Sequence, residues 1–204
     1  MESEDLVDAA AGAGIEPVEL LVAGEDVVPE LLAEVSTLGH APRVVAVYRR
    51  ADLPVGARDV VLALWKVSDP GNVGTLLRTA DAFGAAVSLS QGCADPVGPR
   101  ALRASAGAIF RVPLTEWDDL PERRVALVAH GGTPLPDATL EAPLAFLLGA
   151  EREGLPHELV GRAEAVTIAT PGEAESLNVA VAGALALYER FRRTQRQWPR
   201  SGRL

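Results

Sequence analysis

The chain has 204 residues, of which 48% are hydrophobic and 4% aromatic, and its formal net charge is −9. This length is enough for one full α/β domain and a small appendage. A single cysteine, Cys93, excludes a disulfide framework within the monomer, and the three scattered histidines lack the spacing of zinc ligands. No apolar run reaches membrane-spanning length and the N-terminus is acidic, so we expect a cytoplasmic protein that binds neither a membrane nor a metal.

The charges are distributed unevenly along the chain. Residues 1–42 hold ten acidic residues and no Lys or Arg, whereas residues 190–204 hold six Arg and no acid. The net charge argues against a general nucleic-acid binder, but arginine clusters suit bidentate contacts to phosphate. A solvated tail explains the C-terminal arginines equally well. A second basic group consists of Arg100, Arg103, Arg111, Arg123 and Arg124.

The first part of the chain is predicted to form a small α/β unit that ends near residue 52. Its apolar pattern alternates between helical and extended stretches. A unit this short would leave one edge of its sheet without a pairing strand. We expect helices at 5–13 and 27–38, extended segments at 18–22 and 44–48, and a linker at 49–57.

The rest of the chain is predicted to form a mostly parallel sheet with helices on both faces. Short apolar runs of strand length alternate there with helical stretches, which is typical of that architecture. The predicted strands are 59–65, 86–90, 124–129, 144–148 and 165–169.

A turn and a helix follow the first of these strands. The turn is the sequence DPGN at 69–72, in which proline fixes φ and the next two residues tolerate positive φ. Helical periodicity covers 73–83, and Gly84 is expected to cap the C-terminus of the helix. Asn72 and Arg78 would therefore lie where open α/β sheets bind ligands. An ordinary strand–turn–helix with a surface arginine is the simpler alternative.

The strand at 144–148 closes with the acidic, glycine-flanked loop GAEREGLP. Gly149 removes a Cβ at a place where a flat ligand could lie against the backbone. Glu151 is an unusual residue for the buried end of a strand unless a cation or backbone amides pair with it. Taken alone, this loop is better explained as a plain turn.

The most informative segment is SLNVAVAGALALYE at 176–189. The Ser176 hydroxyl is expected to cap a helix, and Asn178 would lie in the first turn. The small apolar residues that follow allow another backbone to approach closely. The simpler alternative is a capped helix buried in the core.

In this order the segments resemble the SpoU (TrmH-type) family of knotted SPOUT methyltransferases. The family motif N-x-G-x-x-x-R-x-A is found at 72–80 and G-x-E-x-x-G-L at 149–155. The third motif corresponds to a strand end at Ile168 followed by 176–189, and 103–110 matches the family's central segment. The chain departs from the family at three positions. Ala169 and Thr170 stand where Pro-Met is common, and Ala180 replaces a serine.

The resemblance implies a fold and an activity. It implies a C-terminal trefoil-knot methyltransferase domain over 58–197, preceded by an abbreviated ribosomal-protein-like RNA-binding domain over 1–52 and followed by a basic tail at 198–204. Family members methylate ribose 2′-hydroxyls of RNA with S-adenosylmethionine as cofactor. The ribosomal-protein-like unit favours ribosomal RNA as the substrate, and transfer RNA is the alternative.

The resemblance also implies roles for particular residues. Arg78 would grip the adjacent phosphate and stabilise the developing alkoxide, since a guanidinium keeps its proton and is a poor base. Four further residues would orient Arg78 and close the loops around the site: Asn72, Glu151, Ser176 and Asn178. The expected cofactor-binding residues are Gly149, Ile168, Thr170, Pro171, Gly172, Leu177 and Asn178. The expected RNA-binding residues are Arg78, Arg100, Arg103 and Arg111.

Family members are dimeric, so we expect a homodimer in which the helix at 179–189 packs against its equivalent. Two other classes of function stay open. A non-catalytic RNA-binding assembly factor of the same fold would have lost Arg78, Glu151 or Asn178, and all three are present. A nucleotide-binding oxidoreductase or phosphate binder would need a glycine fingerprint or a P-loop lysine, and neither occurs.

Overall fold

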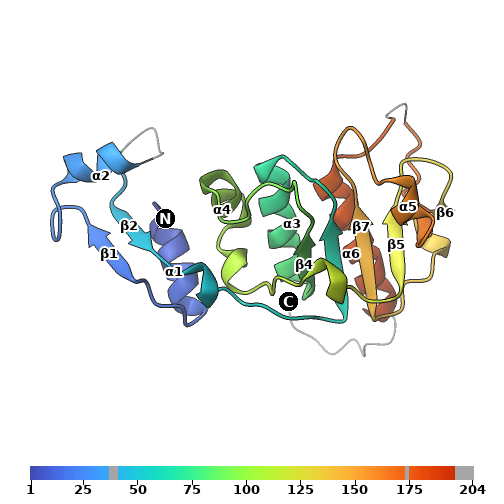
Figure 1. Cartoon of the computed structure of the whole chain (residues 1–204), viewed down its shortest axis with the longest axis horizontal. Coiled ribbons are helices and arrows are strands. Elements are labelled where there is room, and N and C mark those ends of the chain that lie inside the picture. The colour runs from blue at the N-terminus through green and yellow to red at the C-terminus, as the bar shows by residue number, and fades with distance from the viewer. Residues whose placement is uncertain (37–40, 173–174, 196–204) are drawn as a thin grey trace.

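The computed structural model describes residues 1–36, 41–172 and 175–195. Two lobes lie side by side along the long axis of the molecule (Figure 1). The smaller N-terminal lobe holds a two-stranded sheet and two helices, and the larger C-terminal lobe holds a six-stranded sheet. No helix in the described part of the chain is long and apolar enough to cross a membrane.

The large sheet is parallel throughout, as the spacing of its strands predicts. Its strand order is β4-β3-β7-β5-β8-β6, and every neighbouring pair is parallel. The edge strand β6 was not predicted, because it has only two residues and one of them is a proline. The strands are β3 (Val60–Leu64), β4 (Ala86–Leu89), β5 (Arg124–Leu127), β6 (Thr133–Pro134), β7 (Leu144–Leu148) and β8 (Glu164–Thr167).

Helices cover both faces of this sheet, which confirms the predicted fold class. Alternate residues of each central strand point to opposite sides, so Leu62 joins one hydrophobic cluster and Val61 the other. The first cluster includes α3 (Pro70–Phe83) and α6 (Val179–Gln195). The second is covered more thinly, by residues of the short elements α5 (His157–Val160) and η3 (Trp117–Asp119) and their surroundings.

The helix α3 begins three residues earlier than predicted. Asp69 is its N-cap, with Oδ1 accepting a hydrogen bond of 2.9 Å from the Asn72 N–H, and Pro70 takes the first helical position. The DPGN sequence is therefore a cap and a first turn rather than a separate turn with positive φ. Gly84 ends the helix in the left-handed conformation, at φ 67°, as the sequence predicts.

In the N-terminal lobe, an antiparallel pair of strands packs with two helices. Met1 exchanges main-chain hydrogen bonds with Ala46 and so extends the sheet beyond β2. Near the boundary between the lobes, α1 contributes Leu6 and Ala10 to the main core. The elements are α1 (Glu4–Gly12), β1 (Glu19–Val22), α2 (Pro29–Val35) and β2 (Val44–Val47).

The predicted linker has a defined structure. It contains a 3-10 turn, η1 (Arg50–Asp52), and its Pro54 and Gly56 exchange main-chain hydrogen bonds with Leu114 of the larger lobe. The lobes also meet where the Tyr48 ring approaches the Phe110 ring, with 5.6 Å between centroids. The connection between lobes is therefore packed. The predicted tail at 198–204 lies outside the described residues, and the trefoil knot stays a prediction.

Candidate functional site

The candidate site lies at the carboxyl ends of the central strands. A cavity of about 460 Å³ opens there between the loops that follow β5, β7 and β8 and the start of α6. This is the edge at which open α/β sheets bind ligands. The cavity brings together seven of the predicted site residues: Gly149, Glu151, Ile168, Thr170, Ser176, Leu177 and Asn178.

Hydrogen bonds connect one side chain from each of the three motifs. Asn178 Nδ2 donates to Asn72 Oδ1 at 3.0 Å, and Asn72 Nδ2 donates to Glu151 Oε1 at 2.8 Å. These residues are separated by 106 and 79 positions in the sequence. We call this chain of contacts the amide relay. It holds the start of α3, the loop after β7 and the start of α6 in one arrangement.

The direction of the amide relay is determined by the groups at its two ends. Asn178 Oδ1 accepts from the N–H groups of Ala180, at 2.9 Å, and Val181, at 3.2 Å, so the Asn178 NH₂ must face Asn72. At the other end the Glu151 carboxylate only accepts, so Asn72 must present its NH₂ to it. Each amide is thereby fixed in one orientation.

Two predictions about the third motif are wrong. The helix α6 starts at Val179, so Asn178 is the cap rather than a first-turn residue. Ser176 lies two residues before the cap and lines the cavity instead. An asparagine caps a helix as well as a serine does, so local sequence alone does not distinguish the two.

The loop after β7 also differs from its prediction. A Cβ on Gly149 would lie 2.5 Å from the Leu155 N and still closer to the Gly154 carbonyl carbon. The glycine is required because the loop folds back on itself there, and no ligand needs to be invoked. Glu151 is exposed, and its partner is the Asn72 amide rather than a buried cation.

Helix packing explains two other glycines of the motifs. A Cβ on Gly74 would lie 2.6 Å from the Ala104 Cβ and closer still to the Ala101 carbonyl oxygen, so this glycine lets α3 contact α4 (Pro99–Ser105). In α6, Gly183 lies against Leu76 and Leu148. The small residues of α6 therefore pack in the core of their own lobe, in agreement with the simpler alternative of a helix buried in the core.

The four predicted RNA-binding arginines differ in their surroundings. Arg78 is exposed on α3 and, within the described residues, makes no hydrogen bond or ion pair. Arg100 and Arg103 are exposed on α4. Arg111 instead binds Asp81 of α3 through two hydrogen bonds, of 3.0 and 2.7 Å. Its guanidinium is already occupied, which fits a structural role better than a phosphate contact.

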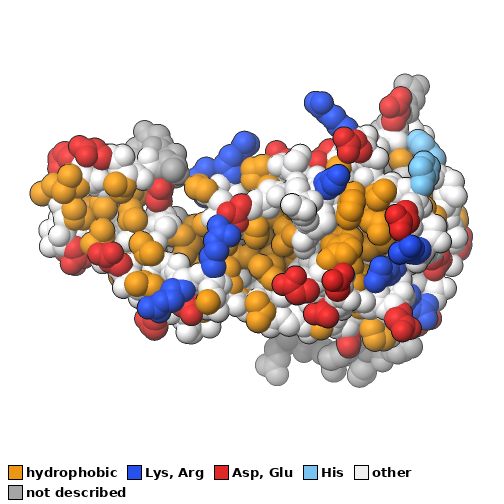
Figure 2. All heavy atoms as spheres, viewed as in Figure 1, with side chains coloured by type: hydrophobic (Ala, Val, Ile, Leu, Met, Phe, Trp, Pro, Cys, Tyr) orange, Lys and Arg blue, Asp and Glu red, His pale blue; other side chains and the backbone are white. Residues whose placement is uncertain are grey.

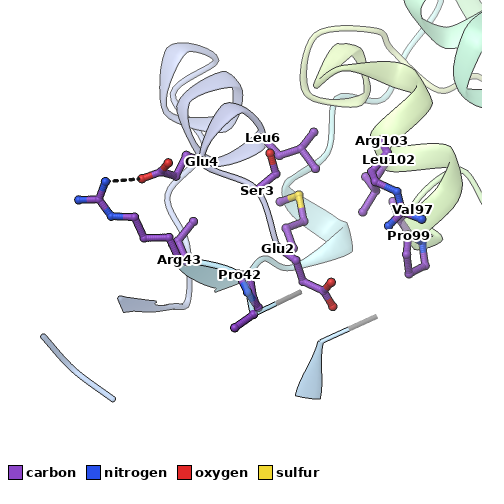
Figure 3. Close-up of a pocket in the computed structure, with 13 residues that line it drawn as sticks. Glu2, Ser3, Glu4, Leu6, Pro42, Arg43, Val97, Pro99, Leu102 and Arg103 are labelled. Atoms are coloured by element: carbon purple, nitrogen blue, oxygen red, sulfur yellow. Dashed lines mark ion pairs between the residues drawn. The ribbon is translucent and has the colours of Figure 1, made fainter. Parts of the chain in front are cut away.

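A second cavity, of about 570 Å³, lies at the junction of the lobes (Figure 3). Its walls come from the chain start, α1, the segment before β2 and α4, and Arg103 lies at one side of it. On the other side Arg43 pairs with Glu4 at 3.3 Å. Of the predicted site residues only Arg103 lines it, so it is separate from the amide relay.

Eleven further lining residues of the first cavity were not predicted, and five of them bear on how it could bind a ligand. Val128 and Ala129 follow β5, and the rule that ligands bind at the carboxyl ends of parallel strands could have found them. The others, Arg152, Glu153 and Glu175, carry no signal in a single sequence. Pro171 and Gly172, which were predicted, are exposed and do not line the cavity. Among the described residues, no group of acidic, His and Cys side chains could hold a metal ion.

The charges around this cavity suit a cationic ligand with an apolar body. Three carboxylates line it, from Glu151, Glu153 and Glu175, against the single guanidinium of Arg152. Aliphatic side chains such as Ile168, Leu177 and Val179 form other parts of the wall. The volume is in the range of small-molecule sites, ~300–1,000 Å³.

Comparisons with known proteins give a consistent result. A family model described as the SpoU rRNA Methylase family matches residues 59–188. The chain is 36% identical over 141 residues to the 23S rRNA (guanosine(2553)-2′-O)-methyltransferase RlmP of Bacillus subtilis, covering 63% of this chain and 56% of that protein. It is 34% identical over 152 residues to an uncharacterized tRNA/rRNA methyltransferase of Synechocystis, covering 69% of this chain and 54% of that protein.

The chain therefore spans about half the length of these curated relatives. Among solved structures, the SpoU methyltransferase AviRb from Streptomyces viridochromogenes, in complex with AdoMet, matches with a TM-score of 0.82 at 25% identity. That match covers 98% of this chain and 91% of the other. The likeness includes both lobes.

Proposed function

Because the chain belongs to the SpoU rRNA Methylase family, we propose that it transfers a methyl group from S-adenosylmethionine to a ribose 2′-hydroxyl of RNA. One observation carries the proposal beyond family membership. The amide relay joins all three family motifs at the mouth of a cavity, through hydrogen bonds of 2.8 and 3.0 Å. A protein that had kept only the fold would not need this arrangement.

The cavity fits the proposed cofactor. S-adenosylmethionine supplies an electrophilic methyl group when bound, and its sulfonium is a cation. The carboxylates of Glu153 and Glu175 would favour that cation, and Arg152 could pair with a carboxylate. Ile168 and Leu177 offer apolar surface for a flat ring. Gly149 and Thr170 would add main-chain contacts.

We propose that Arg78 is the residue that contacts the RNA substrate at the reacting ribose. It is exposed and unpaired within the described residues, so its guanidinium is available to an RNA phosphate and to the 2′-oxygen. A donor aimed at developing negative charge stabilises the transition state. The amide relay acts on Arg78 indirectly, by fixing the start of the helix that carries it.

We favour ribosomal RNA over transfer RNA as the substrate, in the cytoplasm. The support is the Bacillus subtilis relative, whose name specifies 23S rRNA. The Synechocystis relative, whose name gives both kinds of RNA, keeps transfer RNA as the alternative.

We also propose a homodimer in which α6 contributes to the interface. Its small residues face its own core, but the opposite side carries Val181, Leu185 and Tyr188, exposed to 47%, 39% and 53%. These positions share one face of a helix and form an apolar stripe. Light scattering at micromolar concentration should give twice the chain mass, and a Leu185→Glu variant should shift it toward the monomer.

The test of the activity uses radiolabelled S-adenosylmethionine with unmodified ribosomal RNA and, separately, with transfer RNA. Transfer to a ribose should leave one linkage resistant to alkaline cleavage. An Asn72→Asp variant is the matched loss-of-function control, because two carboxylates would then face each other across the 2.8 Å contact to Glu151. Label on a base, or no transfer to either RNA by a protein that binds the cofactor, would overturn the proposal.

A further inference from the structure

The first 42 residues, which hold α1, β1 and α2 of the N-terminal lobe, are poorly suited to contact RNA. Residues 1–42 hold ten acidic residues, no Lys or Arg, and no Phe, Tyr or Trp. Affinity for RNA comes from cations on phosphates and from aromatic stacking on bases. This part of the chain offers neither, and its charge repels a phosphate backbone.

The same lobe exposes an apolar surface on α2. Val28, the N-cap of α2, and Leu31 and Val35 within the helix are exposed to 57%, 50% and 65%. Leu31 and Val35 are four residues apart and lie on one side of the helix, and Val28 precedes its first turn. The neighbouring Leu32 is buried and fixes the helix to the lobe. We call the three exposed residues the α2 stripe. Figure 2 shows hydrophobic side chains gathered across this lobe, with acidic side chains above and below them.

The acidic groups border the α2 stripe closely in sequence. Glu30 and Glu34 lie on α2 itself, and Glu25 precedes the helix. Within the described residues, none of these three forms an ion pair. An apolar strip beside unpaired carboxylates complements a surface that is apolar and positively charged.

A second copy of this lobe is not that surface. Residues 1–52 of each copy hold eleven acidic residues against three arginines, Arg43, Arg49 and Arg50, so two such lobes would both be strongly negative. Like charges held together in this way oppose association. The occupant must carry the opposite charge.

We propose that the α2 stripe and its acidic border dock a basic protein segment that inserts aliphatic side chains among its lysines or arginines. The α2 stripe supplies the apolar contact and the carboxylates select for positive charge. In this proposal the α2 stripe of the N-terminal lobe binds a basic protein and does not bind RNA. Methyl transfer to naked RNA is therefore independent of the stripe, and failure of one proposal leaves the other standing.

The test measures binding of fluorescent probes by anisotropy. The probes are a fifteen-residue peptide of repeated Leu-Lys-Lys, the same peptide with serine for leucine, and a single-stranded RNA of fifteen nucleotides. The full chain should bind the leucine peptide more tightly than the serine peptide. Replacing the stripe by Val28→Ser, Leu31→Ser and Val35→Ser should weaken that binding by about tenfold or more, as expected for central interface residues.

Two matched controls make this test specific. Val55→Ser removes an exposed valine outside the lobe's helices, at 81% exposure, and should change nothing. Glu30→Gln with Glu34→Gln should weaken peptide binding and flatten its salt dependence, whereas Glu116→Gln with Glu122→Gln on the larger lobe should not. Equal binding of both peptides, equal loss with the control variants, or stripe-dependent binding of the RNA would each overturn the proposal.

A crosslink in cells identifies the occupant directly. A photoreactive amino acid at Leu31, which is half exposed, should crosslink to a basic protein, and the crosslink should disappear with Glu30→Gln and Glu34→Gln. A crosslink to RNA, to a second copy of the chain or to an acidic protein contradicts the proposal. So does the absence of any crosslink.

Discussion

The two lobes of this protein bury apolar surface in opposite ways. The larger lobe has a six-stranded sheet covered on both faces, and Phe146, Leu62 and Leu147 are completely buried in it. The smaller lobe has two strands and buries few large side chains, among them Leu32, while Leu31 and Val35 of the same helix stay exposed. Small units cannot bury a large fraction of their surface.

In the two proposals above, chemistry and recognition belong to different lobes. The amide relay needs three elements held to within the tolerance of a hydrogen bond, and the sheet packed from both sides supplies that rigidity here. The smaller lobe holds none of the motif residues and leaves several apolar side chains exposed, among them Val18, Leu31 and Val35. Changes in the larger lobe should therefore affect stability and catalysis, whereas changes in the smaller lobe should remain local.

The largest expected effect comes from the cores. Phe146→Ala should lower the free energy of unfolding by ~3–5 kcal/mol, because a central strand cannot collapse into the cavity. Leu32→Ala should cost ~2 kcal/mol and should act mainly on the smaller lobe. Urea unfolding measures both losses of free energy, and hydrogen exchange shows which lobe each loss affects. Loss of amide protection in β3 and β7 with Leu32→Ala would show that the lobes are not separable.

The next effect concerns catalysis. Arg78→Lys keeps the charge but loses the planar fork, so we expect the turnover number to fall by ~10²–10³ with cofactor affinity near wild type. Arg43→Lys, in an exposed ion pair of the smaller lobe, should change neither. Single-turnover kinetics and calorimetry with S-adenosylmethionine separate the two quantities. If Arg78→Lys weakens cofactor binding as much as it slows turnover, Arg78 is part of the pocket's structure.

Two helix glycines of the larger lobe, Gly74 and Gly183, should respond differently to replacement by alanine. Gly74→Ala overpacks against α4 backbone, and after the helix gain from removing a glycine it should destabilise by ~1–2 kcal/mol. Gly183→Ala should be nearly neutral, because its nearest neighbour is the movable end of the Leu76 side chain, at 2.5 Å. Thermal unfolding compares them. An equal loss at both positions would contradict this explanation.

The smallest expected effect depends on pH. Hydrogen bonds from Arg192 and then Arg193 lower the pKa of Glu189 to about 2, from its usual 4.5. Because the folded pKa is the lower one, this stabilisation is present above pH 4.5 and is lost as the pH falls toward 2. Glu189→Gln should therefore be less stable than wild type at pH 6, and the difference should shrink at pH 3. Urea titrations at both values test this, and a difference independent of pH would contradict the assignment.

Sequence patterns predicted most of the fold because the physical causes are local. The five predicted strands are apolar runs between turn residues, and each lies within about two residues of its prediction. The cap at Gly84 follows from the freedom of glycine at positive φ. The late end predicted for α2 and the unpredicted edge strand β6 fall where the apolar pattern is weak.

Contacts within the site were less predictable. The sequence by itself determined the fold class, the order of the motifs and the residue types that reach the cavity, since apolar periodicity and turn chemistry act over a few neighbouring residues. Only the tertiary structure decided that Asn178 caps α6, that Glu151 pairs with Asn72, and that Gly149 serves its own loop. Each of those roles depends on which backbone or amide from a distant element lies within hydrogen-bond or van der Waals reach, and no local pattern encodes that distance.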